Sequence, residues 1–353
     1  MTDQPVEIIL GVDTHAQVHV ACLLDQLGRL RATRTIPATR AGSQQLLGWA
    51  AQHGQLTRAG VEGTGTYGAG LTRHLTRAGV TVVEVDRPNR QHRRRHGKSD
   101  PTDAEAAARA VLAGQATATP KARSGIVESI RVLRVARSSA IKARTQVANQ
   151  LRDLIVTAPD QLRAQLQPLS TATRVAHLAA SQPAHGADPA AATHRALWHL
   201  ARRYQTLTAE LDALAADLDT LTRRAAPRLL ARPGVGVETA GTLLVTAGDN
   251  PDRLGSDAAL AALCGASPVP ASSGKITRHR LNRGGDRQAN SALWAITLTR
   301  LRIDPATRAY AKRRTSQGKT TKEIMRCLKR YLVRELFPLL KADLHDAAQL
   351  TLT

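Results

Sequence analysis

The sequence predicts a mixed α/β domain at the N-terminus, then a long helical region and a mainly helical C-terminal region. Short apolar runs separated by turn residues fill the first 85 residues. Apolar residues recur at heptad spacing in the middle, and helical patterns alternate with glycine-rich loops in the last third. The expected boundaries are 1–115, 116–225 with a linker near 180–193, and 226–353. With 353 residues, 42% of them hydrophobic, the chain has enough apolar surface for two or three cores.

The first domain is expected to begin with three strands and to continue as α/β units. Apolar alternation predicts strands over 6–13, 17–25, 30–36, 57–63 and 80–85. Helices are expected over 40–53, over 67–79 and from Asp100 onward. The resulting order, β-β-β-α-β-α-β-α, is typical of RNase H-like domains.

Four carboxylates fall where the chemistry of such a domain lies. Asp13 ends the first strand, Glu62 ends the fourth, and Asp100 and Asp103 share one face of the last helix. Carboxylates that converge repel one another without a cation, and hard oxygen ligands suit Mg²⁺. Paired Mg²⁺ ions activate the attacking oxygen and stabilise the leaving oxygen in phosphoryl transfer.

Each acid alone also has a plainer interpretation. Asp13 could cap a turn, and Glu62 could be an ordinary loop acid. Asp100 could be the N-cap of its helix, with Pro101 at the first helical position and Asp103 at the third. The four acids together favour the metal site over these separate explanations.

The charge of the chain predicts a phosphate-rich partner. The net charge is +22 and the isoelectric point is about 11.2. Aromatic residues are only 2%, so binding should depend on phosphate contacts rather than on a base-stacking platform. A basic segment precedes Asp100 and is expected to hold nucleic-acid phosphates beside the acids, although a solvated loop is the alternative; its cations are Arg87, Arg90, Arg93, Arg94, Arg95 and Lys98.

The remaining composition favours a cytoplasmic protein. Cys22, Cys264 and Cys327 are far apart and lack zinc-binding spacing, as expected in a reducing compartment. The N-terminus has no signal-peptide pattern, and no apolar run approaches the length that spans a bilayer.

The middle region predicts two long helices that act as scaffold. The first covers 125–155. In the second, apolar residues step alternately by three and four positions, which is typical of a coiled coil; they are Leu197, Leu200, Tyr204, Leu207, Leu211, Leu214, Leu218 and Leu221. Pairing within one chain and pairing between chains both explain this pattern.

The last third contains two candidate phosphate contacts. The Pro-Gly-Val-Gly segment in 231–248 resembles the second half of a helix-hairpin-helix, whose amides approach a phosphate, or is a plain turn. Further on, Ser272 and Ser273 precede Gly274, and either a turn or a nucleophile toward phosphorus explains them. Basic residues follow, before a helix through Trp294; they are Lys275, Arg278, Arg280, Arg283 and Arg287.

Six motifs in order resemble the DEDD transposases of the insertion-sequence 110 group, which are bridge-RNA-guided recombinases. They are "GVDTH", "VEGTGTYG", "KSDPTDA", "RPGVGVETAGTLL", "LAALCGASPVPASSGK" and "NRGGDRQANSALW". The resemblance implies a RuvC-like domain whose Mg²⁺-binding tetrad is Asp13, Glu62, Asp100 and Asp103. It also implies that Ser273, which precedes the glycine of the "SG" motif, is the nucleophile, with Ser272 as its neighbour.

The resemblance further implies how such a protein acts. The serine forms a phosphoserine link to DNA, and strand exchange excises or inserts the element. A non-coding guide RNA pairs with donor and target DNA. The protein is a homo-oligomer, between dimer and tetramer, in which the carboxylates of one subunit are completed by the serine of another. The segment 156–195 matches no motif of the group.

Three other functions remain as alternatives. A RuvC-like Holliday-junction nuclease would use the four acids and water, without the serine. A non-catalytic nucleic-acid-binding protein would need neither. A sugar-kinase-like ATPase would explain "GVDTH", but the charge of +22 and the lack of adenosine-loop glycines argue against it.

Overall fold

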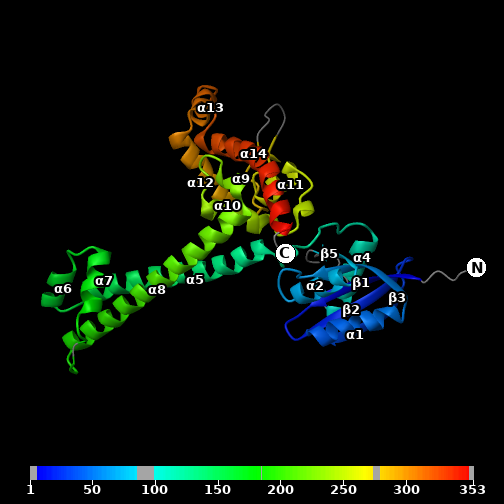
Figure 1. Cartoon of the computed structure of the whole chain (residues 1–353), viewed down its shortest axis with the longest axis horizontal. Coiled ribbons are helices and arrows are strands. Elements are labelled where there is room, and N and C mark those ends of the chain that lie inside the picture. The colour runs from blue at the N-terminus through cyan, green and yellow to red at the C-terminus, as the bar shows by residue number, and fades with distance from the viewer. Residues whose placement is uncertain (1–5, 86–98, 184, 273–278, 350–353) are drawn as a thin grey trace, which may run out of the picture. The chain divides into compact units, whose positions relative to one another are not determined.

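The computed structural model describes residues 6–85, 99–183, 185–272 and 279–349. The chain forms two compact units (Figure 1). Unit 1 contains Met1–Ser124 together with Ala247–Ser256, and unit 2 contains Gly125–Thr246 and Asp257–Thr353. Each unit is described by itself.

Unit 1 is built on a five-stranded sheet in the order β3-β2-β1-β4-β5. The strands are β1 Glu7–Thr14, β2 Val18–Asp25, β3 Leu30–Pro37, β4 Gln55–Glu62 and β5 Thr81–Val85. β1, β2 and β3 are antiparallel, whereas β1, β4 and β5 run parallel. In this register Val12 pairs with Val61, so the carboxyl ends of β1 and β4 lie side by side. The predicted strands are therefore present, each within about two residues of its expected ends.

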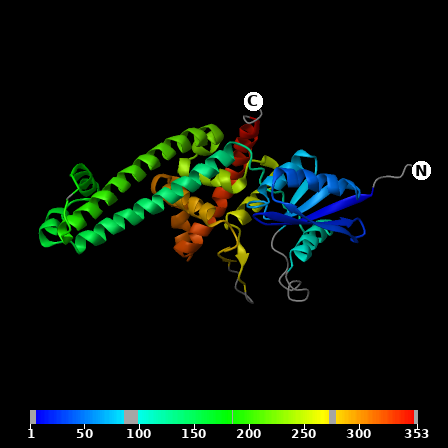
Figure 2. The same ribbon diagram turned by 90° about the horizontal axis from the view of Figure 1, so that it is seen from below.

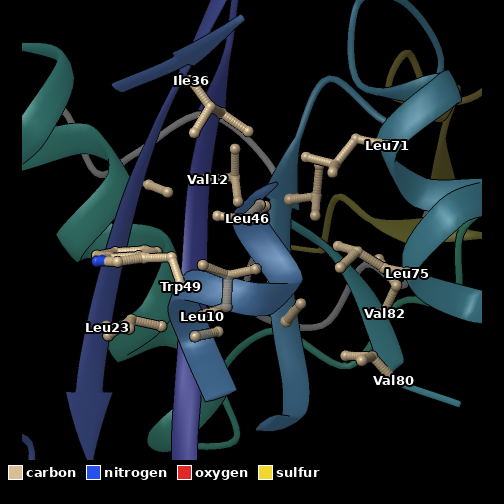
Figure 3. Close-up of a cluster of buried hydrophobic side chains, with 14 of the residues drawn as sticks. Leu10, Val12, Leu23, Ile36, Leu46, Trp49, Leu71, Leu75, Val80 and Val82 are labelled. Atoms are coloured by element: carbon tan, nitrogen blue, oxygen red, sulfur yellow. The ribbon is translucent and has the colours of Figure 1, made fainter. Parts of the chain in front are cut away.

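Helices cover both faces of the sheet because β1 is buried on both sides. Alternate residues Ile8, Leu10 and Val12 join the core beneath α1 (Arg40–Ala51) and α2 (Ala69–Arg77). Figure 3 shows Leu10 and Val12 in this core. On the opposite face, Ile9 packs with Cys22, Leu24 and the alanines of α4 (Asp100–Leu112). By the same alternation, Gly11 and Asp13 belong to the α4 face.

The α4 helix lies unusually close to the sheet because glycines face it. A Cβ atom on Gly11 would lie 2.0 Å from the carbonyl oxygen of Ala104, and one on Gly60 would lie 2.6 Å from that of Ala107. Small residues on both partners therefore set the distance between α4 and the carboxyl ends of β1 and β4.

A short segment from the last third of the chain completes unit 1. Asn250 Nδ2 donates a hydrogen bond to the carbonyl of Pro120 at 3.0 Å, and Arg253 Nε donates to that of Thr119 at 2.9 Å. This segment includes the 3₁₀ turn Pro251–Arg253. No pattern in the sequence indicates that residues so far apart would meet.

Unit 2 contains two long helices that pack along each other, α5 Ile126–Val156 and α8 Pro189–Ala225 (Figures 1 and 2). Val147, Leu151 and Ile155 of α5 share a core with Leu197 and Ala201 of α8. The eight predicted seam residues of α8 are all buried or half-buried. A partner for the seam is thus provided within the same chain.

The segment between α5 and α8 contains two short helices where no element was predicted. They are α6 (Asp160–Leu166) and α7 (Thr171–Ala180). The expected linker at 180–193 is too long, because α8 already begins at Pro189 with Asp188 as its N-cap. Leu166 and Leu178 bury their side chains in the same core, which explains why this segment folds.

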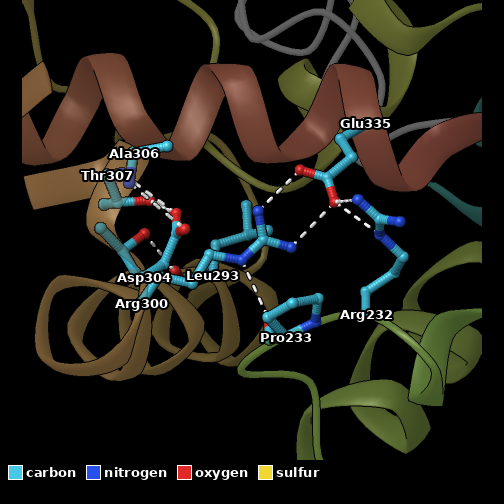
Figure 4. A network of polar contacts seen from close by, with 9 residues as sticks. Arg232, Pro233, Leu293, Arg300, Asp304, Ala306, Thr307 and Glu335 are labelled. Atoms are coloured by element: carbon cyan, nitrogen blue, oxygen red, sulfur yellow. Dashed lines mark hydrogen bonds and ion pairs between the residues drawn. The ribbon is translucent and has the colours of Figure 1, made fainter. Parts of the chain in front are cut away.

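The C-terminal part of unit 2 is mainly helical, as predicted. Its elements are α9 Pro227–Leu230, α10 Val237–Ala247, α11 Asp257–Leu263, β6 Val269–Pro270, β7 His279–Arg280, α12 Arg287–Ile303, α13 Pro305–Ser316 and α14 Thr321–Gln349. Figure 4 shows how Glu335 of α14 holds Arg300 of α12 and Arg232 of the turn after α9. Arg300 Nε also donates to the carbonyl of Pro233 at 2.8 Å. The Pro-Gly-Val-Gly turn is thereby fixed to α12 and α14.

Candidate active site

Three metal-ligating side chains meet at the carboxyl end of β1. Nε2 of His15 lies 3.3 Å from Oδ2 of Asp13 and 3.4 Å from Oδ2 of Asp100. One ligand atom from each residue falls within 4.8 Å of the others. The site therefore combines the carboxyl end of β1, including the residue that follows the strand, with the first turn of α4.

Burial distinguishes the members of this cluster. Asp13 is 8% exposed because it ends a strand covered by α4, whereas His15 and Asp100 are half-buried and face solvent on one side. The cluster therefore combines one buried carboxylate with two half-buried side chains.

The N-cap of α4 is Ser99, and the expectation that Asp100 would fill that position is wrong. Ser99 Oγ accepts the backbone N–H of Thr102, and Pro101 occupies the second helical position rather than the first. A hydroxyl satisfies the helix end at this place, so the Asp100 carboxylate is directed to His15 instead.

Asp103 and Glu62 flank the cluster without joining its three-residue group. Asp103 lies one turn along α4 from Asp100 and is 3% exposed. Glu62 is half-buried at the end of β4, and its carbonyl accepts the Thr14 hydroxyl at 2.8 Å. All four predicted acids thus lie at the strand and helix ends that the sequence indicated.

The electrostatics of Asp13 favour a cation. Burial raises the pKa of Asp13 above its ordinary value, and the charges of Asp100 and Asp103 raise it further, while His15 opposes the shift. Ionisation of Asp13 is therefore less favourable than that of an exposed aspartate, and a bound positive charge would stabilise the ionised form. Carboxylate oxygens are ligands that Mg²⁺ prefers, so these residues fit a Mg²⁺ site.

His15 is the residue that sequence reasoning missed. It belongs to the quoted "GVDTH" segment, but no role was assigned to it. The available signal was its spacing, because a residue two positions after Asp13 on an extended chain points to the same side.

The predicted nucleic-acid contacts are only partly described by the structure. Four of them are described and are exposed: Ser272, Arg280 on β7, Arg283 in the following loop, and Arg287, the first residue of α12. The other predicted residues lie outside the described residues; they are Arg87, Arg90, Arg93, Arg94, Arg95, Lys98, Ser273, Lys275 and Arg278. In sequence, Ser273 falls between β6 and β7.

The turn before α10 stays a prediction as a phosphate contact. Gly234 has a φ of +80°, and Val235 N–H donates to the carbonyl of Arg232, which makes a tight turn between α9 and α10.

No helix in the described parts of the chain is long and apolar enough to cross a membrane.

Comparisons with known proteins match both ends of the chain. Residues 10–158 match the IS110-type DEDD transposase family, described as a transposase. Residues 226–312 match a family described as "Transposase IS116/IS110/IS902 family".

Three curated relatives bear the names of insertion elements. An IS110 "uncharacterized 43.6 kDa protein" of Streptomyces coelicolor is 36% identical over 36% of this chain and 32% of its own length. A "Mini-circle putative transposase for IS117" of the same organism is 26% identical over 90% of both chains. An IS900 "uncharacterized 42 kDa protein" of Mycobacterium paratuberculosis is 29% identical over 40% of this chain and 36% of its own length.

Proposed function

Because the chain belongs to the IS110 family of transposases, we propose that it cleaves and exchanges DNA strands through a serine nucleophile assisted by its carboxylate site. The observation that carries this proposal is the meeting of Asp13, His15 and Asp100 at the carboxyl end of β1, with Asp103 and Glu62 beside them. A buried carboxylate with a raised pKa, held among other acids, suits a metal-assisted reaction on phosphate.

The carboxylates are proposed to hold Mg²⁺, with Asp13 and Asp100 as direct ligands and Asp103 and Glu62 completing the set. When bound, Mg²⁺ supplies Lewis-acid stabilisation of the charge that develops on phosphate oxygens. Asp13 positions the site through its strand, and Asp100 through the first turn of α4. His15 bridges the two carboxylates and restrains both.

Ser273 is proposed as the nucleophile because it is the serine of the family's serine-glycine motif. Its hydroxyl gives up a proton as its oxygen forms a bond to phosphorus, and the bond from that phosphorus to a deoxyribose oxygen breaks. The departing oxygen takes up a proton, and the protein is left joined to one DNA strand. Attack by the rejoining strand's hydroxyl reverses these steps.

The partners follow from charge and family. A net charge of +22 suits a protein that contacts both DNA and RNA phosphates. The basic segment before Asp100 and the cations Lys275, Arg278, Arg280, Arg283 and Arg287 are proposed as those contacts. A non-coding guide RNA is proposed to select donor and target, in a homo-oligomer between dimer and tetramer.

Adduct trapping tests this function. The protein is incubated with DNA from its element's ends, the adjacent non-coding RNA and Mg²⁺, then denatured and examined for a protein–DNA band. We expect a band in the native protein and in Ser272→Ala, and no band in Ser273→Ala or Asp13→Asn. Because Ser272 adjoins Ser273 and is chemically identical, it is the matched control.

Two results would overturn the assignment. Cleaved DNA without an adduct, unaffected by Ser273→Ala, would establish a water-using nuclease of the Holliday-junction type. Function that survives all acid substitutions would establish a non-catalytic nucleic-acid-binding protein.

A further inference from the structure

A cationic pocket lies in unit 2. None of its lining residues belongs to the carboxylate site, and only Arg280 has been assigned a role above. It is bounded by the loop 265–268 after α11, by β7, by the turn between α13 and α14, and by residues of α14. Its volume is about 470 Å³. That is within the range of about 300–1,000 Å³ in which proteins bind small molecules.

The lining of this pocket is strongly positive. Six cationic side chains line it, against the single lining carboxylate of Glu323; they are Arg280, Lys319, Arg326, Lys329, Arg330 and Arg334. Asp257 pairs with Arg330 at 2.6 Å and with Arg334 at 3.8 Å, whereas Arg280 and Lys319 form no ion pair with any described residue. The excess positive charge calls for an anionic ligand.

Lys329 makes this pocket more than a charged surface. It is 5% exposed, and its Nζ donates to Oδ1 of Asn290 at 2.8 Å. Asn290 is held in turn by the carbonyl of Cys264, to which its Nδ2 donates at 2.8 Å. Asn290 is the only hydrogen-bond partner of Lys329 among the described residues, and an ammonium has three N–H donors.

The burial of Lys329 limits which ligands reach it. Burial lowers the pKa of Lys329, and the charge of Arg326 lowers it further, so a bound anion would stabilise the ammonium. Lys329 lines the pocket and is otherwise buried, so a group that enters the pocket comes beside its side chain. A DNA duplex is too wide for its phosphates to enter a cavity of this volume. One nucleotide of an unpaired strand is small enough to do so.

An aromatic wall adds a surface for a base. Tyr331 lines the pocket, is 51% exposed, and has Arg334 at 6.0 Å from its ring centroid. An exposed ring beside an arginine is the arrangement on which unpaired bases stack. One ring does not form a platform that stacks several bases, but it is sufficient to stack one base.

We propose that this pocket, here called the α14 pocket, holds one nucleotide of an unpaired DNA strand, with its phosphate at Lys329 and its base against Tyr331. The inference rests on the proposed function, because strand exchange supplies unpaired DNA. It adds a positioning site for that strand on the unit that carries the β6–β7 segment.

Binding of a labelled single-stranded DNA oligonucleotide tests the proposal, by fluorescence anisotropy at several salt concentrations. Lys329→Met keeps the length of the side chain and removes its charge. We expect it to weaken binding about tenfold, because a charge-assisted phosphate contact is lost. The slope of log affinity against log salt should fall by about 0.7, the value for one phosphate contact on a single strand.

Two further variants keep the test decisive. Arg326→Gln alters the pocket at a half-buried position, and it should weaken single-strand binding in the same direction if Lys329→Met proves unstable. Arg203→Gln removes an exposed charge on α8, outside the pocket, and should leave the affinity unchanged. Duplex DNA of the same sequence should lose much less affinity on Lys329→Met than the single strand does.

Three outcomes would overturn the proposal. These are native affinity in both pocket variants, an equal loss for duplex and single strand, or a loss for RNA of the same sequence without a loss for DNA. An adduct band together with any of these would leave the proposed function intact. Pocket-dependent single-strand binding without an adduct would reject the serine mechanism alone.

Discussion

The Asp13 carboxylate combines strand-end burial with two neighbouring carboxylates on α4. Its pKa is raised by that burial and by those charges, and His15 provides partial compensation. A residue kept in such surroundings lowers the stability of the isolated protein and gains a favourable interaction only when a cation arrives.

Mg²⁺ should stabilise the native protein through this residue. We expect Mg²⁺ at about 100 times its dissociation constant to add about 2.7 kcal/mol of stability, because it binds the folded state only. Differential scanning calorimetry with and without Mg²⁺ measures the shift. Asp13→Asn should abolish most of it, and an equal shift in that variant would place the ion elsewhere.

The stability of the metal-free protein should depend on pH through Asp13. Because its pKa is raised from 3.8, the folded state holds this proton more tightly than the unfolded chain does. Ionising Asp13 therefore lowers the free energy of unfolding as pH rises from about 3.8 through the raised pKa. Denaturant titrations of the native protein and Asp13→Asn, compared pH by pH, should show the variant gaining relative stability across that window. A constant difference would contradict the assignment.

A site residue could be placed from the sequence when its position followed from the helix or strand that carries it. The positions of Asp13, Glu62, Asp100 and Asp103 in the fold could be predicted because strand ends and helix starts can be inferred from periodicity. His15 was missed because its role arises from a contact across to α4. Ser99 and Asp100 are both good capping residues, so their order in the cap could not be decided from sequence.

Among the elements, α4 is the one whose placement most directly sets the site. It approaches the sheet over Gly11 and Gly60, where a Cβ atom would clash with its backbone. The distance between the carboxylates of β1 and those of α4 is therefore set by glycines, which carry no functional side chain.

Gly11→Ala should displace α4 and weaken metal binding. The added methyl would lie 2.0 Å from a backbone oxygen, and we expect a loss of about 3 kcal/mol in the free energy of unfolding. Chemical denaturation and Mg²⁺ calorimetry measure both effects. Gly48→Ala in α1 is the control, because nothing lies within 4 Å of that position, and it should stabilise by about 0.5–1 kcal/mol. Native Mg²⁺ affinity in Gly11→Ala would contradict the coupling.

The Glu335 network should contribute strongly to unit 2. Hydrogen bonds from Arg300 lower the pKa of Glu335, and Arg300 is largely buried. Glu335→Ala should cost about 2 kcal/mol, less than a fully buried pair because Glu335 is partly exposed. The native protein should also lose this contribution as pH falls through the lowered pKa. Thermal denaturation at pH 7 tests it, and Asp219→Ala, which breaks an exposed pair with Arg223, should change little.

The elements themselves were largely predictable, and their exceptions have physical causes. The strands and α5 have clear periodicity, so their ends fell close to the expected ones, whereas α8 begins eight residues before its predicted seam. The helices α6 and α7 are short, and they are stabilised by a core shared with α5 and α8 rather than by their own pattern. The α14 pocket combines residues from three separate elements, which no local spacing reveals.

At the scale of the whole molecule, the carboxylates belong to unit 1 and the proposed serine to the chain segment of unit 2. Neither unit alone carries both parts of the proposed reaction. The return of 247–256 to unit 1 also means that a cut at 226 would remove part of that unit, which sequence-based boundaries could not foresee.

Mixing two inactive variants should restore activity. If the active site is composite, Asp13→Asn supplies the serine and Ser273→Ala supplies the carboxylates within one oligomer. We expect each variant alone to give no adduct and the mixture to give adduct on the Asp13→Asn chain. A size tag on one variant identifies the labelled chain. No adduct in the mixture, with hetero-oligomers present by pull-down, would indicate a site completed within one chain.

The paired helices α5 and α8 also define a length. At 1.5 Å per residue, the 31 residues of α5 span about 46 Å. Along duplex DNA, where each base pair advances about 3.4 Å, this equals about 13 base pairs, which is more than one helical turn. Groups bound at the α6–α7 end and beside α9 would therefore face different sides of the duplex. A change of one heptad in both helices would move that register by about three base pairs.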